Sequence, residues 1–316
     1  MPTIIVLGEA LIDIFAEKGV PLRQAKSLYP TPGGAPANVA VALARLGADV
    51  GFVGKVGVDD YGDFLIDLLK HEGVDITYFT ADPNGPTMLA VVAMPSATEQ
   101  HFILYNGANT LLKTEELSPD YFDAANIYIY SSVTLAEASR TAALDVARWM
   151  LAAGKQVIFD VNLRPLVWPN MDIARERIEK SVELSTILKL NEIELEFLTG
   201  TTDPAIGSQQ LLSQGVQLCC VSLGAEGAYF NNGSAAGHVA PFNVSVQDTT
   251  GSGDAFVAGL AYQLLHADTQ ISSLDEQTLQ QIIRFANACG ALAATQIGGM
   301  SASPTLAAVN QLQTSA

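Results

Sequence analysis

From about residue 126 to residue 313, short apolar segments alternate with longer segments rich in small or amphipathic residues. Short apolar runs are typical of buried strands, and the longer segments are typical of helices. Strands separated by helices form parallel sheets that are covered on both faces. The chain is therefore predicted to be an α/β protein with a mostly parallel central sheet. The predicted strands are 127–131, 157–160, 187–190, 218–223, 227–231 and 239–246; the predicted helices are 138–153, 172–184, 192–198, 205–213, 253–265, 277–297 and 304–313.

The first part of the chain repeats this alternation and then departs from it. Strands are predicted at 3–8 and 50–56, with a helix that Gly47 closes between them and another helix through Glu72. The strands at 87–93 and 100–105 have only a turn at 95–98 between them, and 15–31 suggests short irregular strands. We expect a small protruding sheet from about 14–31 and 87–106. No repeat or low-complexity linker is visible, so a single domain over 1–316 is predicted.

Composition excludes several classes of protein. Apolar residues make up 49% of the 316 residues and charged residues 16%, as in globular rather than disordered chains. The net charge of −17 argues against nucleic acid or anionic membranes as partners. No membrane-length apolar run or signal peptide is visible, and the three cysteines read as buried thiols. These features predict a cytoplasmic protein.

The basic residues are distributed unevenly. Lys189 is the last lysine, and beyond it Arg284 is the only arginine. No lysine-bearing phosphate loop of the G-x-x-x-x-G-K-[ST] type occurs. If the second half binds phosphates, we expect backbone N–H groups and a bound cation to do so.

The most informative turn is Gly251-Ser252-Gly253-Asp254, between the predicted strand 239–246 and an apolar helix. Glycines let the backbone approach a ligand, and N–H groups at a helix start attract anions. Beside such a site, Asp254 can take a proton from a hydroxyl group. The alternative is an ordinary helix start in which Asp254 only complements the helix dipole.

Further polar clusters follow other predicted strands. Asp13 comes after the first strand, and Gly33-Gly34 lead into a helix that carries Asn38. Asp160, Asn162 and Arg164 are spaced by two, so extended backbone would turn all three toward one ligand. Each cluster also has a structural explanation as a turn or a cap.

Three more clusters lie in the second half. Asn191 and Glu194 follow a strand, and a carboxylate there can hold water bound to magnesium. The turn with Ser222, Gly224 and Gly227 can approach a nucleotide or can be a plain hairpin. Asn287 lies in a helix that leads to the loop 295–304, whose carbonyl groups can surround a monovalent cation.

Together these motifs resemble the ribokinase-like, or PfkB, family of carbohydrate kinases, essentially from end to end. The segments 33–38 and 248–256 are similar to the two family signatures, in the right order. The resemblance implies an α/β core with a β-sheet lid. It also implies ATP and Mg²⁺ as cosubstrates and phosphorylation of a sugar hydroxymethyl group.

The resemblance also implies roles for individual residues. Asp254 would be the base, with Gly251, Ser252 and Gly253 as the anion hole. Sugar contacts would come from Asp13, Gly33, Gly34 and Asn38, with Asn162 and Arg164 beside them. Nucleotide and magnesium contacts would come from Asn191, Glu194, Ser222, Gly224, Gly227 and Asn287. A potassium site would be formed by Asp248, Thr250, Ala293, Gln296, Gly298 and the Ala302 position.

Within the family the chain is most similar to fructokinases, with one departure. Asn106 stands where an arginine often follows the tyrosine of the second lid strand. Fructose is the expected substrate, with 2-keto-3-deoxygluconate and ribose or nucleosides as alternatives; dimerisation through the lid is also consistent with the resemblance. A sensor without turnover is a second class. A nicotinamide dehydrogenase is disfavoured because no G-x-G-x-x-G follows the first strand.

Overall fold

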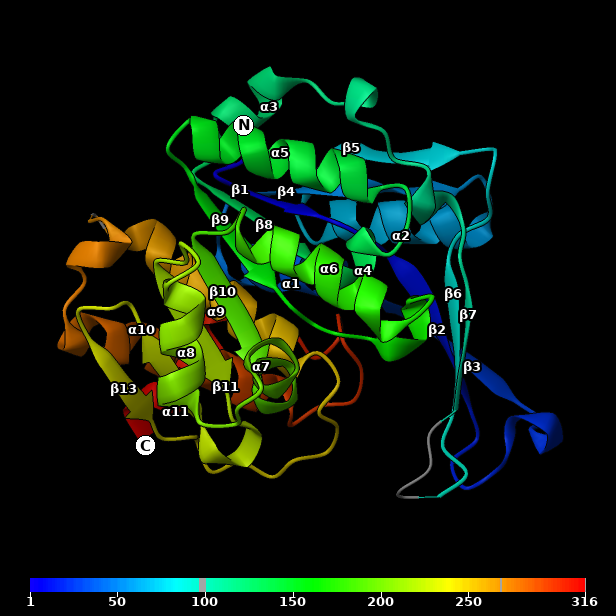
Figure 1. Cartoon of the computed structure of the whole chain (residues 1–316). Coiled ribbons are helices and arrows are strands. Elements are labelled where there is room, and N and C mark those ends of the chain that lie inside the picture. The colour runs from blue at the N-terminus through cyan, green and yellow to red at the C-terminus, as the bar shows by residue number, and fades with distance from the viewer. Residues whose placement is uncertain (97–100, 268, 316) are drawn as a thin grey trace.

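The computed structural model describes residues 1–96, 101–267 and 269–315. Two sheets dominate it, a nine-stranded sheet and a four-stranded one that extends away from it (Figure 1). The large sheet has the order β13-β12-β11-β10-β9-β8-β1-β4-β5. Its strands are β1 Ile4–Leu7, β4 Val50–Gly57, β5 Asp75–Asp82, β8 Ile127–Ser131, β9 Gln156–Asp160, β10 Ile187–Asn191, β11 Leu218–Ser222, β12 Ala228–Asn231 and β13 Ala236–Val239.

Neighbouring strands from β11 to β5 run parallel, whereas β12 and β13 are antiparallel additions at one edge. Consecutive residues of β1 enter two different cores. Ile4 and Val6 pack with one set of helices, and Ile5 and Leu7 pack with another. The predicted α/β fold with helices on both faces is therefore confirmed.

The helices divide between these two faces (Figure 1). One face is covered by α1 Ala35–Leu46, α2 Asp60–His71, α9 Ser252–His266, α10 Glu276–Ala293 and α11 Leu306–Ser315. The other is covered by α3 Pro119–Asp123, α4 Ser132–Leu135, α5 Arg140–Ala152, α6 Met171–Val182, α7 Glu192–Thr199 and α8 Pro204–Leu212.

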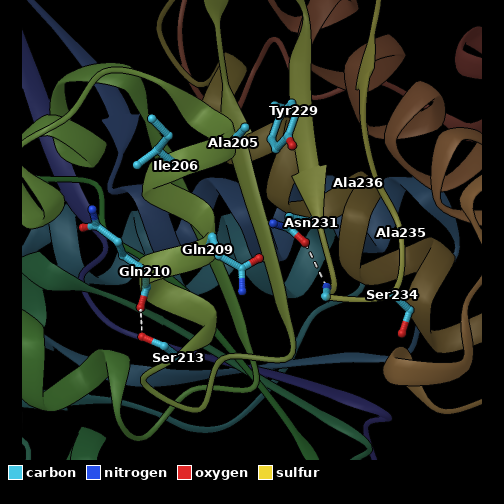
Figure 2. A pocket seen from close by; sticks show the side chains of 11 residues that line it. Ala205, Ile206, Gln209, Gln210, Ser213, Tyr229, Asn231, Ser234, Ala235 and Ala236 are labelled. Atoms are coloured by element: carbon cyan, nitrogen blue, oxygen red, sulfur yellow. Dashed lines mark hydrogen bonds between the residues drawn. The ribbon is translucent and has the colours of Figure 1, made fainter.

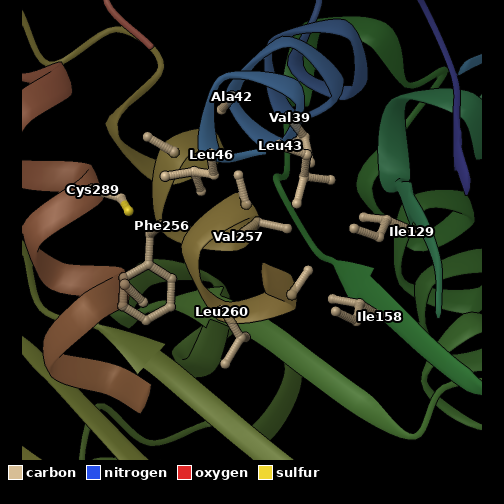
Figure 3. Packing of buried hydrophobic residues seen from close by; sticks show 14 of the residues in the cluster. Val39, Ala42, Leu43, Leu46, Ile129, Ile158, Phe256, Val257, Leu260 and Cys289 are labelled. Carbon is tan, nitrogen blue, oxygen red and sulfur yellow. The ribbon is translucent and has the colours of Figure 1, made fainter. Parts of the chain in front are cut away.

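Helix α9 is packed on both sides, against α1 and α10 (Figure 3). Phe256, Val257 and Leu260 are buried in this contact. At Gly259 an added Cβ would lie 2.8 Å from Cys289 Sγ, so only glycine allows this approach of α9 to α10. The packing fixes the first turn of α9, which carries Asp254.

The small sheet has the order β3-β2-β6-β7. It consists of β2 Leu11–Ala16, β3 Leu28–Gly33, β6 Leu89–Ala93 and β7 His101–Tyr105. Part of the predicted turn at 95–98, and Gln100 of the predicted second strand, lie outside the described residues. Both predicted pairs of strands join one sheet through parallel pairing of β2 with β6.

Two strand predictions need correction. β5 was not predicted because it is an edge strand whose only buried residue is Phe79. The predicted strand 239–246 is wrong, since β13 ends at Val239 and no strand follows before α9. Pro241 cannot donate to a ladder. The N–H groups of Gln247 and Asp248 instead donate to the carbonyl of Ala294, at the end of α10.

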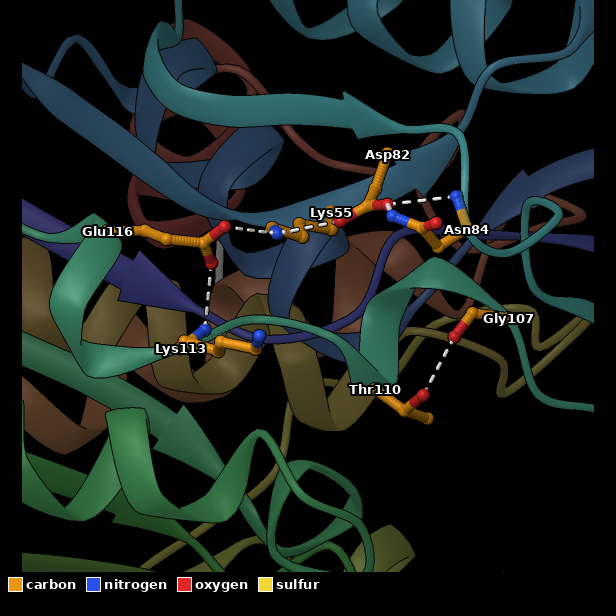
Figure 4. Close-up of polar contacts among 7 residues, drawn as sticks. All are labelled: Lys55, Asp82, Asn84, Gly107, Thr110, Lys113 and Glu116. Atoms are coloured by element: carbon orange, nitrogen blue, oxygen red, sulfur yellow. Dashed lines mark hydrogen bonds and ion pairs between the residues drawn. The ribbon is translucent and has the colours of Figure 1, made fainter.

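An ion-pair network ties the edge of the large sheet to the segment that follows β7 (Figure 4). Lys55 of β4 is 6% exposed, and its Nζ lies 2.8 Å from Asp82 Oδ2 and 2.6 Å from Glu116 Oε1. Glu116 also accepts from the N–H of Lys113. The segment 114–116 is thus fastened to β4 and β5 at the edge of the large sheet by charge.

Candidate active site

The polar residues that follow the central strands meet at one edge of the large sheet. Glu9 follows β1, and Ser131, Asp160 and Asn191 end β8, β9 and β10. These four strands are consecutive neighbours in the sheet. The carboxyl ends of parallel strands are where α/β proteins form ligand sites.

Asn38 and Asp254 are brought together by α1 and α9. Asn38 Nδ2 donates to Asp254 Oδ2 at 2.8 Å, and both side chains are buried. Gly251 caps α9 with φ 77°, and an added Cβ there would lie 3.0 Å from Gly299 Cα. The turn therefore needs glycine for its backbone angle and for the close approach of the 298–300 loop.

Burial raises the pKa of Asp254 to about 6, and the charge of Asp160 adds to the shift. The hydrogen bond from Asn38 and the charge of Lys189 partly oppose it. A carboxylate with this pKa is ionised at neutral pH, yet it is more basic than an exposed aspartate. It is therefore suited to accept a proton from a hydroxyl group.

Lys189 is a site residue that the sequence analysis missed. Its buried Nζ lies 3.1 Å from Asp160 Oδ1, and an added Cβ on Gly253 would lie 3.1 Å from the same Nζ. A buried ammonium thus stands beside the first turn of α9. Lys189 adds a positive group beside the N–H groups and the bound cation that the sequence analysis expected in the second half. The available signal was a lysine inside an apolar strand, where a buried charge needs a reason.

The predicted anion hole is only partly open. Residues in the first turn of a helix have no intrahelical acceptor for their N–H groups. The N–H of Ser252 nevertheless donates to the carbonyl of Thr249 at 3.2 Å. A phosphoryl group that binds the N–H of Ser252 has to replace that bond. Gly253 lies within the first turn, so its N–H has no acceptor inside the helix.

The predicted convergence of Asp160, Asn162 and Arg164 through extended backbone is wrong in its geometry. Asn162 has φ 36°, so the chain turns there, and Asp160 pairs with Lys189 instead. Arg164 is exposed, but its charge still lowers the pKa of Asp254. The three residues therefore border the same region without sharing one face.

Asp13 reaches the site from the small sheet. It lies in β2 opposite Thr31 of β3, and its carboxylate fills the space where Gly33 would carry a Cβ. Burial and the charge of Asp254 raise the pKa of Asp13 to about 6. At Gly34, with φ 103°, an added Cβ would lie 2.5 Å from the carbonyl oxygen of Glu9. Both sheets thus contribute a carboxylate to one polar region.

Asn191 and Glu194 form a reciprocal capping box at the start of α7. Asn191 Oδ1 accepts from the N–H of Glu194 at 2.9 Å, and Glu194 Oε2 accepts from the N–H of Asn191 at 2.8 Å. Glu194 Oε1 also accepts from the N–H of Leu163 at 2.7 Å. Both carboxylate oxygens are therefore engaged, which suits contact with a metal through water better than direct coordination.

The predicted nucleotide residues lie at the antiparallel edge. Ser222 ends β11, and Gly224 begins the 3-10 turn Gly224–Glu226. At Gly227, with φ 93°, the space for a Cβ is taken by the carbonyl of Val239. Asn287 Nδ2 donates to that same carbonyl at 3.1 Å. This glycine and this asparagine hold the hairpin to α10 and so shape the neighbouring surface.

The predicted cation loop packs against the segment that leads into the turn at 251–254. Asp248 Oδ1 accepts from the N–H of Thr250 at 3.0 Å, and Asp248 Oδ2 accepts from the N–H of Gly298 at 3.1 Å. The carbonyl of Ala293 accepts from Gln296. At Gly299 an added Cβ would lie 2.5 Å from Asn38 Nδ2. The segments 248–250 and 293–302 are thereby joined beside Asn38.

Several buried polar atoms of this region have no hydrogen-bond partner among the described residues. Among them are Glu9 Oε2, Asn38 Oδ1, Ser131 Oγ, Thr134 Oγ1, Asn162 Nδ2 and Ser252 Oγ. Buried polar groups in proteins are nearly always paired. Both donors and acceptors are available, as a ligand rich in hydroxyl groups requires.

A broad hollow of about 820 Å³ lies elsewhere, between α8 and the β12–β13 hairpin (Figure 2). Gln209, Tyr229 and Asn231 line it. Among the residues described there, no carboxylate or ammonium lines this hollow. Its size does not make it the active site, because none of the carboxylates with a raised pKa of about 6 to 8, Glu9, Asp13 and Asp254, lines it.

The model of the pfkB family carbohydrate kinases matches residues 1–306. A probable chloroplastic fructokinase-6 of Arabidopsis thaliana is 38% identical over 316 residues, covering 98% of this chain and 82% of the relative.

Two solved structures are similar over nearly the whole chain. A fructokinase from Xylella fastidiosa with bound ATP has a TM-score of 0.90 at 35% identity, covering 100% of this chain and 99% of the other. A double-mutant fructokinase from Vibrio cholerae O395, with fructose, ADP and a potassium ion bound, has a TM-score of 0.88 at 33% identity. It covers 99% of this chain and 98% of its own. Within the described residues, no helix combines the length and apolarity needed to cross a membrane.

Proposed function

Because the chain belongs to the pfkB family of carbohydrate kinases, we propose that it transfers the γ-phosphoryl group of ATP to a hydroxymethyl group of fructose. One observation carries this proposal. The buried carboxylate of Asp254, held by Asn38, stands next to the ammonium of Lys189 at the start of α9. A base and an anion site are thereby adjacent, as phosphoryl transfer to a hydroxyl requires.

In the proposed reaction, Asp254 accepts the proton of the sugar hydroxyl. The hydroxyl oxygen forms a bond to the γ-phosphorus, the bond to the bridging oxygen breaks, and ADP leaves with that oxygen. Lys189 and the first-turn N–H groups of α9 stabilise the charge on the transferred group. Asp13 and Asn38 orient the sugar.

Two cations are part of the proposal. Asn191 and Glu194 would hold Mg²⁺ through water, and the ion would neutralise phosphate charge. The carbonyl groups of Asp248, Thr250, Ala293, Gln296 and Gly298, with the Ala302 position, would bind K⁺. The potassium ion in the Vibrio cholerae fructokinase supports the second assignment.

A neutral sugar is favoured over an acidic one. Asn106 Nδ2 donates to Glu137 Oε1 at 2.9 Å, so the position where an arginine is common carries an amide bound to a carboxylate. Lys189 is assigned to the transferred phosphoryl group, which leaves Arg164 as the basic residue near Asp254 for the carboxylate of an acidic sugar. The bound fructose of the Vibrio cholerae structure agrees with this choice.

The test is ADP formation in a coupled assay with fructose, 2-keto-3-deoxygluconate, ribose and a nucleoside, each with and without K⁺. We expect the largest kcat/KM with fructose and activation by K⁺. ATP binding without turnover on any of these sugars would support a sensor instead. Higher kcat/KM with the sugar acid would contradict the substrate assignment.

The arrangement of the chain is also part of the proposal, as a single domain over 1–316 with the small sheet as a lid. Exposed apolar side chains gather on two of its strands: Leu28, Tyr29, Phe102, Ile103 and Tyr105. Consecutive residues such as Leu28 and Tyr29 point to opposite faces, and β3 and β7 are the two edges of the small sheet. Exposed apolar side chains along these edge strands suit a homodimer. Sedimentation velocity should show a dimer that Phe102→Glu dissociates; a monomeric wild type would contradict it.

A further inference from the structure

A small enclosed pocket of about 10 Å³ lies beside the end of β1, and Glu9 and Thr134 both line it. This volume holds about one water-sized oxygen atom. Glu9 is 5% exposed and Thr134 is 6% exposed. An added Cβ on Gly8 would lie 3.0 Å from Thr134 Oγ1, so α4 approaches the end of β1 closely here.

The other polar side chains that line this pocket are already engaged. Asn109 Oδ1 accepts from the N–H of Gly107, Glu137 Oε1 accepts from Asn106, and Ser139 Oγ donates to the carbonyl of Thr134. In contrast, Glu9 Oε2 and Thr134 Oγ1 have no partner among the described residues. Two residues that each carry an unpaired buried oxygen line one oxygen-sized pocket, which indicates a ligand, because leaving such groups unpaired is costly.

We propose that Glu9 and Thr134 form a subsite for a single oxygen of the sugar site, which either a sugar hydroxyl or a water bridging to the sugar supplies. The subsite rests on the proposed function, because it places one more contact beside Asp254. Glu9 connects the pocket with the region around Asp254. It lines the pocket, and it also lies close enough to Asp254 and Arg164 to feel both charges.

The protonation state of Glu9 fits this role. Burial raises its pKa to about 8, and the charge of Asp254 adds to the shift, while the N–H groups of Glu9 and Ala35 and the charge of Arg164 oppose it. Glu9 is therefore mainly a neutral carboxylic acid at pH 7. A neutral acid can donate its O–H to the bound oxygen without placing a second negative charge next to Asp254.

Steady-state kinetics of Glu9→Ala and Thr134→Val test the subsite. We expect each to raise KM for fructose about 5- to 20-fold, the loss of one buried hydrogen bond, while KM for ATP is unchanged. Glu9→Gln should recover most of the affinity lost in Glu9→Ala, because an amide is also a neutral donor. Thr141→Val, on the exposed surface of α5, is the matched control and should behave as wild type.

A panel of monodeoxy fructoses identifies the source of the oxygen. If a sugar hydroxyl supplies the oxygen, the analogue that lacks this hydroxyl should bind to wild type more weakly than fructose does. In Glu9→Ala the same analogue should bind as tightly as fructose. If water supplies the oxygen, each analogue should lose as much affinity relative to fructose in Glu9→Ala as it does in wild type. Unchanged KM for fructose in both variants, at wild-type melting temperature, would overturn the subsite. Should Glu9→Ala fail to fold, the nearly isosteric Thr134→Val decides. A wild type inactive on every sugar defeats the proposed function instead.

Discussion

Asn38 donates a hydrogen bond of 2.8 Å to Asp254 across 216 positions of sequence, and both side chains are buried. The bond joins the first turns of α1 and α9, each of which follows a glycine with positive φ. It lowers the pKa of Asp254 against the effect of burial. The pair thus sets both the position and the basicity of the proposed base.

Asp254→Asn should leave ATP binding nearly intact and lower kcat by at least about 10²–10⁴-fold, the usual contribution of a general base. The amide still accepts from Asn38 but cannot take a proton. A coupled ADP assay measures kcat, and calorimetry measures ATP binding. Near-normal turnover would remove Asp254 from the mechanism.

The same substitution should stabilise the protein at neutral pH. The pKa of Asp254 is about 6 in the folded protein and 3.8 ordinarily, so its charge opposes folding. This cost is absent below pH 3.8, grows between the two values and is complete above about pH 6. Asp254→Asn should raise the free energy of unfolding by up to about 3 kcal/mol at pH 8 and by little at pH 4. Denaturant titrations at both pH values check this; an equal effect at both would refute it.

The pH dependence of kcat/KM should report the protonation of Asp254. Protonation of Asp254 removes the base, so kcat/KM for fructose should fall below about pH 6. Asn38→Ala removes the hydrogen bond that lowers the pKa of Asp254, so the acid limb should move to higher pH. A profile of that variant whose limb stays in place would show that Asn38 does not tune the base.

Lys189 should serve both stability and turnover. Lys189→Met leaves Asp160 buried without its ion-pair partner and should cost about 3–5 kcal/mol. Combining it with Asp160→Asn removes the unpaired charge and should recover most of that stability. The double variant should still lose about 10²–10³-fold in kcat, because charge stabilisation is gone. Wild-type kcat in the double variant would make Lys189 purely structural.

Lys55 should matter for stability more than a surface lysine does. Lys55→Met removes a buried ammonium from between Asp82 and Glu116 and should cost about 1–3 kcal/mol, since both carboxylates reach solvent. Lys180→Met is the control, because its 2.6 Å pair with Glu176 is exposed and should contribute little to stability. Urea unfolding of both variants measures the difference. Equal losses would contradict the role of burial.

The sequence by itself determined the α/β class, the central helices and strands and the glycine turn at 251–254. These features depend on local periodicity and on backbone angles that favour glycine. It signalled through Pro241, but did not decide, that 240–246 lacks a strand, because the N–H groups of Gln247 and Asp248 find their acceptor in the distant carbonyl of Ala294. Nor did it show β5, whose pairing with β4 rather than its own pattern makes it a strand.

Only the tertiary structure decided which charges meet. Lys189 lies 65 positions before Asp254 in the sequence, and the parallel order of β9 and β10 places it beside both Asp160 and the start of α9. Asn162 turns the chain at φ 36°, which no spacing rule predicts. Basicity likewise follows from burial and neighbouring charges, so the unusual pKa values of Glu9, Asp13 and Asp254 arise only once the chain is folded.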